Sequence, residues 1–108
     1  MEQYLYQLRP TRLEMVTVGP TAAETAIVSE HFAHLEQLTN QGVMLLMGRT
    51  QDNTADTFGI AIFQAESEDQ ARAIMGDDPA VKNGIMRAKL FPFRIALHGH
   101  LPLEQDER

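Results

Sequence analysis

The sequence contains no cysteine, and its 9 Lys and Arg residues are outnumbered by 15 Asp and Glu residues. The absence of cysteine excludes disulfide frameworks, Cys-ligated zinc, iron–sulfur clusters and thiol catalysis. The net charge of −6 argues against nucleic acid and anionic membranes as partners, because both require a basic surface. No apolar run approaches the roughly 18–20 residues of a membrane span. The first residues lack the basic start and apolar core of a signal peptide, so we expect a cytoplasmic protein.

A chain of 108 residues is the size of one domain and needs no disulfide or structural metal to bury a core. The sequence shows no internal repeat and no linker-like stretch. Its only change in composition is a charged C-terminal end. We therefore expect one domain over residues 1–98 and a charged tail over residues 99–108.

Four segments have the composition of β-strands. In the first, Tyr4, Tyr6 and Leu8 occupy every second position, which is strand periodicity. The two middle segments are continuously apolar and joined by a polar loop, which predicts a hairpin buried on both faces. Pro92 predicts an edge or a bulge in the last strand. Residues 13–18 predict an extended connection or a short extra strand. The four predicted strands are residues 3–9, 43–47, 58–63 and 89–97.

A capping box at Thr21 and Glu24 predicts the start of a long helix, because each residue can bond the backbone amide of the other. The helix should cover about residues 22–41, with Gly42 allowing the left-handed turn that ends it. At 100° per residue, one face of this helix forms an apolar stripe. The stripe consists of Ile27, Val28, His31, Phe32, Leu35 and Leu38.

A second capping box, at Ser67 and Gln70, predicts another helix that stops near Gly76. Directly after it, Asp78 can cap a short helical turn whose first residue is Pro79. The order of elements is therefore strand, helix, strand, strand, helix, strand. That order is typical of the ferredoxin-like α+β fold.

In a ferredoxin-like sheet both helices lie on one face. The two middle strands are nevertheless apolar on both faces, so the uncovered face must also be buried. The simplest arrangement is a symmetric homodimer in which two sheets pack face to face.

Without cysteine, the histidines are the strongest candidates for chemistry. His31 lies inside the apolar stripe, where it is either a structural residue bonded to a backbone carbonyl or a general base beside a carboxylate. His34 lies one turn later, and the two rings could face one ion. The usual zinc signature instead separates two histidines by four positions and adds a Glu, so we expect no metal. His98 and His100 follow the last strand and are expected in a solvated loop.

Asp78 precedes a proline, which is a natural position for a helix cap. A capping carboxylate is held in place, and a carboxylate held in place can orient an imidazole. Arg49 and Arg12 are candidates for binding an anionic group of a substrate, with surface salt bridges as the alternative.

Three segments of the chain resemble the YciI-like (YCII-related) family: EHFAHLEQLTNQGVMLLMGRT from Glu30, FGIAIFQAESEDQARAIMGDDPAVKNGIM from Phe58, and AKLFPFRIAL from Ala88. The similarity extends over about residues 3–97. Its most specific elements are His31, Gly48, Asp78, Pro79, Val81 and Gly84. One position departs from the pattern, because many relatives have Gly-Pro where this chain has Gly48 and Arg49. The substrate of another member is therefore not transferred to this chain.

The resemblance implies a dimeric α/β barrel of ferredoxin-like protomers, with His31 and Asp78 at the positions of a proposed catalytic His–Asp pair. Among the family's activities is dehydrochlorination of a chlorinated hydroxyhydroquinone. We therefore expect a small enzyme that needs no cofactor. In it His31 transfers a proton and Asp78 orients the ring, in a lyase, isomerase or elimination reaction on a small, for example aromatic, metabolite.

We expect the pocket of this enzyme between the sheet and the helices, with Arg49, Arg12 and His34 as candidate substrate contacts. Two alternatives remain open. One is a non-catalytic dimeric module that binds a small ligand, and the other is a cofactor-free oxygenase. Fold alone does not choose among them.

Overall fold

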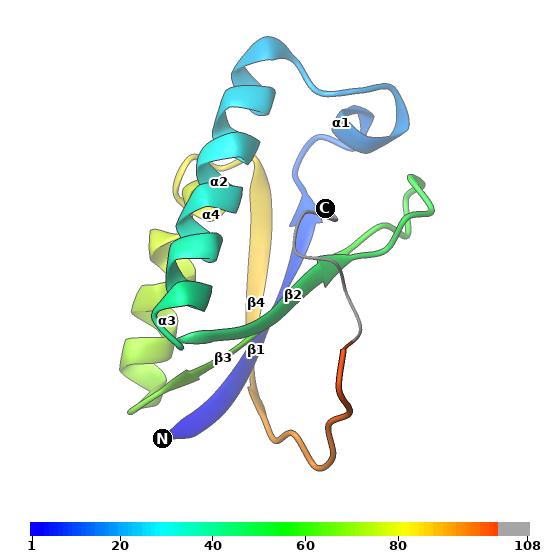
Figure 1. Ribbon diagram of the computed structural model, residues 1–108. Helices are drawn as coiled ribbons and strands as arrows, with labels where there is room; N and C mark the ends of the chain where they lie inside the picture. Colours follow the sequence, from blue (N-terminus) through cyan, green and yellow to red (C-terminus); the bar gives the residue numbers. More distant parts are fainter. Residues whose placement is uncertain (102–108) are drawn as a thin grey trace.

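The computed structural model describes residues 1–101 and contains a four-stranded antiparallel sheet with three helices on one face (Figure 1). Most of the predicted tail, residues 102–108, lies outside the described residues. The elements along the chain are β1 (Glu2–Pro10), α1 (Glu14–Thr17), α2 (Ala22–Asn40), β2 (Met44–Arg49), β3 (Gly59–Ala65), α3 (Glu68–Asp77), α4 (Pro79–Lys82) and β4 (Met86–Phe93).

The strands are arranged in the order β2-β3-β1-β4, and all three neighbouring pairs are antiparallel. This is the ferredoxin-like order, so the predicted α+β fold is confirmed. β1 lies between β3 and β4, and β4 is an edge strand. An edge position accommodates Pro92, which has no amide hydrogen to donate to a neighbour.

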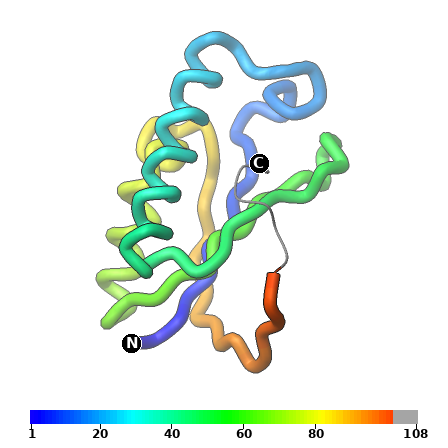
Figure 2. The backbone as a smooth tube through the Cα atoms, viewed as in Figure 1, coloured from blue at the N-terminus to red at the C-terminus, as the bar shows by residue number. Residues whose placement is uncertain are grey.

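The helices cover the sheet face to which alternate residues of β1 and β3 point. Tyr6 and Phe63 are completely buried there, and their rings meet edge to face with centroids 5.6 Å apart. Leu35 of α2 is also completely buried in this core. The short helix α4 contacts both α2 and α3, so the three helices form one layer (Figure 2).

We call the opposite side of the sheet the open face, because α2, α3 and α4 all lie on the other side (Figure 1). Its apolar residues follow from the strand register and alternation. Two of them, Leu46 and Phe93, are 40% exposed. The apolar residues of the open face are Leu5, Leu46, Ile60, Ile62, Phe91 and Phe93. The two middle strands thus carry apolar side chains on both faces, and burial of the open face stays a prediction.

The prediction for residues 13–18 was wrong, because this segment contains the helical turn α1. The strand β1, from which this segment follows, lies inside the sheet and pairs with β3 as far as Leu8 and with β4 as far as Pro10. The backbone amides of the segment bond within it, for example from Thr17 to Leu13. Only Met15 of this turn is buried.

The last strand begins and ends earlier in the sequence than predicted, since β4 covers Met86–Phe93 rather than residues 89–97. Its extent is set by its only partner: Met86 is paired with Pro10 at one end, and Phe93 with Gln3 at the other. A strand cannot continue its ladder beyond the end of its neighbour.

The caps explain where the helices begin. Both bonds of the predicted box at Thr21 and Glu24 are present. At the second box only one is formed: the Ser67 hydroxyl accepts from the Gln70 amide, while the Gln70 side chain accepts from the amide of Glu66.

Candidate functional site

Asp78 lies at the junction of α3 and α4, where the chain changes direction. Its backbone is extended, so it ends one helix and caps the next. Oδ1 accepts a hydrogen bond of 2.9 Å from the Ala80 amide, and Pro79 occupies the first helical position, where no amide hydrogen is needed. The local chain therefore fixes a carboxylate that is completely buried.

His31 reaches this carboxylate from the middle of α2, which packs against α4. Nδ1 lies 2.6 Å from Asp78 Oδ1, and the residue is 7% exposed. Because a carboxylate accepts, Nδ1 must carry the proton of the neutral ring. No described residue bonds Nε2. Every buried side-chain nitrogen and oxygen within residues 1–101 has a partner, so Nε2 must reach the surface.

Tyr6 is the third member of this network, and sequence reasoning missed it. Its hydroxyl donates to Asp78 Oδ2 over 2.7 Å, and the residue is completely buried. The only signal in the sequence is that a buried tyrosine needs a partner for its hydroxyl. Nothing in the sequence indicates that the partner lies 72 positions away.

The environment favours the charged form of Asp78. Burial raises the pKa of this carboxyl, but the hydrogen bond of His31 and the charge of its ring when protonated, with the bonds from Tyr6 and Ala80, outweigh burial and hold the pKa below its usual value. Burial, followed by the charge of Asp78 and its hydrogen bond, raises the pKa of Tyr6. At neutral pH the Asp78 carboxylate therefore accepts hydrogen bonds from the Tyr6 hydroxyl, the His31 ring and the Ala80 amide.

This arrangement leaves the Nε2 lone pair of a neutral His31 at the protein surface. Nε2 can take a proton from a bound molecule, and the neighbouring carboxylate stabilises the resulting imidazolium, as in hydrolase triads. Alternatively, Nε2 can accept a hydrogen bond from a ligand without taking its proton. The geometry therefore suits both general-base catalysis and simple binding.

Arg12 is occupied by an ion pair with Glu24. Its Nε and one terminal nitrogen contact the two carboxylate oxygens over 2.9 and 2.6 Å. The hydrogen bond from Arg12 lowers the pKa of Glu24 to about 2, with help from the Thr21 amide. This pair joins the segment after β1 to the first turn of α2.

Arg49 ends β2 and turns toward the loop between β2 and β3. It donates to the Thr50 carbonyl over 2.9 Å and to the side chain of Asn53. Asp52 holds the same loop by accepting from three threonine hydroxyls. No hydrogen bond or ion pair within residues 1–101 joins Arg12 or Arg49 to the His31–Asp78 pair. His34 is half-buried one turn after His31.

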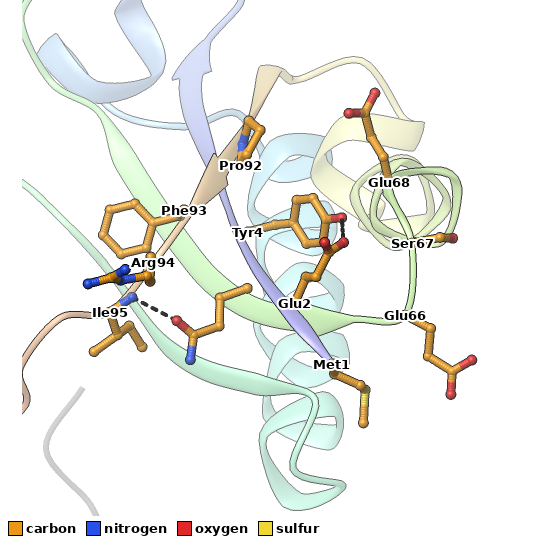
Figure 3. Close-up of a pocket in the computed structure, with 11 residues that line it drawn as sticks. Met1, Glu2, Tyr4, Glu66, Ser67, Glu68, Pro92, Phe93, Arg94 and Ile95 are labelled. Atoms are coloured by element: carbon orange, nitrogen blue, oxygen red, sulfur yellow. Dashed lines mark hydrogen bonds between the residues drawn. The ribbon is translucent and has the colours of Figure 1, made fainter.

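Two hollows of the described chain lie away from the predicted pocket between sheet and helices. The larger, about 800 Å³, lies at the end of the sheet where β1 starts. Figure 3 shows Tyr4 in it, with its hydroxyl bonded to Glu2. The smaller, about 260 Å³, lies near the β2–β3 hairpin. Neither is lined by His31 or Asp78.

Within residues 1–101, no three His, Asp or Glu side chains gather as metal ligands would. None of the helices in this part of the chain has the length and apolar character needed to cross a membrane.

Comparison with known proteins gives one family and one informative structure. A family model for the YCII-related domain matches residues 5–94. The structure of 5-chloro-2-hydroxyhydroquinone dehydrochlorinase from Burkholderia phenoliruptrix, in complex with 2,5-dihydroxybenzoquinone, is similar with a TM-score of 0.61. The two chains are 20% identical over 84% of this chain and 93% of the other, a likeness that shows the fold. A search of curated proteins found no match.

Proposed function

Because this chain belongs to the YCII-related domain family, we propose that it is a small enzyme that transfers protons through His31 and Asp78 without a cofactor. The observation that carries the proposal is the buried contact of 2.6 Å between His31 Nδ1 and Asp78 Oδ1. It is supported by the Tyr6 hydroxyl, which holds the second carboxylate oxygen. The proposed location is the cytoplasm.

The reaction class is proton abstraction followed by elimination or isomerisation. Nε2 of His31 takes a proton from a C–H or O–H group of the substrate, and the electron pair left behind forms a new π bond. In an elimination the leaving group departs as an anion with its own electron pair, and the proton passes from His31 to water. In an isomerisation the proton returns to a different carbon. Asp78 keeps Nδ1 protonated throughout and stabilises the imidazolium.

The substrate class is a small ring compound that carries an acidic proton. The related dehydrochlorinase, which acts on a chlorinated hydroxyhydroquinone, supports this choice. We also propose Arg49, Arg12 and His34 as substrate contacts. For Arg12 this requires that the guanidinium contact substrate while it remains paired with Glu24.

The active form in this proposal is a homodimer. The open face exposes a row of apolar side chains, and a second copy of the same face would remove them from water. Joining two identical faces is also the arrangement implied by a dimeric α/β barrel.

The test is turnover of a panel of halogenated and hydroxylated ring compounds, followed by halide release and ultraviolet absorbance. We expect His31→Ala and His31→Gln to lose activity by at least about a hundredfold, because general-base catalysis contributes about 10²–10⁴-fold. His98→Ala is the matched control and should keep full activity, since His98 lies in the exposed segment after β4.

The proposed catalytic role is overturned if both His31 variants keep the rate of the parent while they also retain its far-UV circular dichroism. If no compound turns over but 2,5-dihydroxybenzoquinone binds to the parent and not to His31→Ala, the protein is the binding module instead. Oxygen consumption in the same assay would indicate the oxygenase.

A further inference from the structure

The open face of the sheet carries positive charge and no negative charge. Its cations are Arg9 on β1 and two residues of β4, Arg87 and Lys89, which follow from the strand register and alternation. Glu2 is the only acidic residue in the four strands, and it is in register with Ala65, which is buried on the helix face. The open face is therefore cationic in a protein whose net charge is −6.

The cations of the open face have no carboxylate beside them. Arg9 and Arg87 are directly opposite each other in the register, and like charges in such a position destabilise a sheet. Arg9 lies over the Phe58 ring and Lys89 over the Phe91 ring, contacts that hold a cation without neutralising it. Within residues 1–101, no ion pair joins any of the three cations to a carboxylate.

This charge opposes the homodimer proposed above, in which two open faces pack together. A charge that is taken out of water without a counter-charge strongly destabilises an interface. Because the two faces are identical, each brings the same cations and no carboxylate. The carboxylates that balance the charge must therefore come from a segment outside the strands.

The loop between β2 and β3 offers little negative charge for this purpose. Asp52 accepts hydrogen bonds from the hydroxyls of three threonines, so its carboxylate is engaged within the loop. Asp56, which is exposed, is the other acidic residue of the loop. One remaining carboxylate per protomer does not balance the pair formed by Arg9 and Arg87.

The segment after β4 leads toward the open face and ends in acidic residues. The chain turns at the end of the sheet and runs back on the side away from the helices (Figure 1). The Ile95 amide donates to the side chain of Gln3, an open-face residue, over 2.7 Å. Leu97 is 93% exposed and Leu101 is 58% exposed. The acidic residues that follow are Glu104, Asp106 and Glu107.

The length of this segment is sufficient to span the interface. Arg87 and Phe93 lie at opposite ends of β4, about 20 Å apart at the rise of a strand. Two packed sheets are separated by about 10 Å. Glu104 follows Phe93 by eleven residues, which reach up to about 36 Å when extended. The acidic residues of one protomer can therefore reach either end of the facing sheet.

We propose that residues 102–108 of each protomer complete the homodimer by docking at Arg9 and Arg87 of the partner subunit. Arginine and carboxylate form strong, often bidentate, hydrogen bonds. Docking on the chain's own open face would instead place this segment where the second sheet must pack, and would oppose the dimer. The inference rests on the homodimer of the proposed function and not on the activity of His31.

The test is the dimer dissociation constant of the full chain, measured by sedimentation equilibrium at pH 7 and low salt. The triple variant Glu104→Gln, Asp106→Asn and Glu107→Gln should raise this constant at least about tenfold. One exposed ion pair accounts for up to about fivefold, and the dimer loses two symmetric contacts.

A matched control removes the same charge elsewhere. Glu30→Gln, Asp69→Asn and Asp77→Asn neutralise three exposed carboxylates of α2 and α3. This variant should not raise the dissociation constant, because a smaller net negative charge reduces the repulsion between protomers. The two triple variants have the same net charge and are expected to differ in their dimer dissociation constants.

A second set of variants tests whether the acidic residues act on the two arginines. In a protein that carries Arg9→Gln and Arg87→Gln, the acidic triple variant should change the dissociation constant by less than about twofold, since contacting residues are not additive. In a protein that carries Arg72→Gln, its full effect should remain, because Arg72 pairs with Glu68 on α3.

Three results would overturn the inference while the parent is a dimer. One is an acidic triple variant that dimerises as tightly as the parent. Another is a triple variant that dimerises more tightly, which would mean that residues 102–108 cover their own open face and compete with the second copy. The third is a loss of dimer in Asp56→Asn alone, which would assign the counter-charge to the β2–β3 loop. A parent that is monomeric at all concentrations would instead overturn the proposed homodimer, and this inference with it.

Discussion

The substitution Asp78→Asn should destabilise the protein strongly although it changes no volume. The Ala80 amide requires an oxygen at the position of Oδ1, so the new NH₂ group replaces Oδ2 and faces the Tyr6 hydroxyl. The phenol must then accept, and its own proton is left without a partner in a fully buried place. His31 and the Ala80 amide keep their bonds, but to a neutral oxygen.

The magnitude follows from these changes. Each bond that loses a charged acceptor weakens by about 1 kcal/mol, and an orphaned buried donor costs about 1–3 kcal/mol. The neutral amide costs less free energy to bury than the carboxylate, and this difference offsets part of the destabilisation. The expected decrease in the free energy of unfolding is therefore roughly 2–3 kcal/mol at pH 7. Against a typical total of about 5–15 kcal/mol, the variant should still fold.

The assay is urea unfolding at pH 7 and pH 3, followed by far-UV circular dichroism, because the chain has no tryptophan. The pKa of Asp78 is lowered in the folded state, so its stabilisation is complete above the ordinary value of 3.8 and is lost as pH falls through the folded value. The difference between parent and Asp78→Asn should therefore shrink at pH 3. Asp77→Asn, one residue earlier and exposed, should change stability by less than about 0.5 kcal/mol.

Two results would refute this reasoning. One is a loss at pH 7 no larger than that of Asp77→Asn, which would mean that the buried bonds contribute nothing net. The other is a loss that is the same at pH 7 and pH 3, because the effect would then not come from the carboxylate charge.

Three further substitutions address other contacts. Tyr6→Phe removes the donor to the buried carboxylate and should lower the free energy of unfolding by about 1–3 kcal/mol, measured by urea unfolding. Ile62→Lys places a charge on the open face and should convert a dimer to a monomer in analytical ultracentrifugation, whereas Val18→Lys, on a residue that is 83% exposed, should not. The pKa of Glu24 falls from 4.5 to about 2, so its stabilisation is complete above 4.5 and disappears toward pH 2. Arg12→Gln should make unfolding less sensitive to pH in that window, and an unchanged profile would contradict the role of the ion pair.

Local patterns were sufficient to predict most of the fold. Alternation of Tyr4, Tyr6 and Leu8 identified β1, and the Thr21 capping box identified the start of α2. These features depend on residues within a few positions of one another, where spacing in sequence reflects spacing in the structure. The order of the elements followed, and with it the ferredoxin-like sheet.

Features that depend on distant partners were not predictable in the same way. Residues 13–18 form a helical turn whose amides bond within the segment, although their partial alternation indicated an extended chain. The cap at Asp78 was predictable from Pro79, but the bond to Tyr6 was not. The role of His31 still rests on the proposal, since its position in an apolar stripe is common to structural and catalytic histidines.

The central position of β1 has a consequence for the order of events during synthesis. During synthesis β1 precedes both of its neighbours, β3 and β4, and Tyr6 is made 72 residues before Asp78. Contacts this distant in sequence slow folding and leave apolar strand edges unpaired while the chain is incomplete. The aromatic side chains of β1 therefore stay exposed to solvent until β4 has been synthesised. A chaperone that shields β1 would act on this protein before the bond between Tyr6 and Asp78 can form.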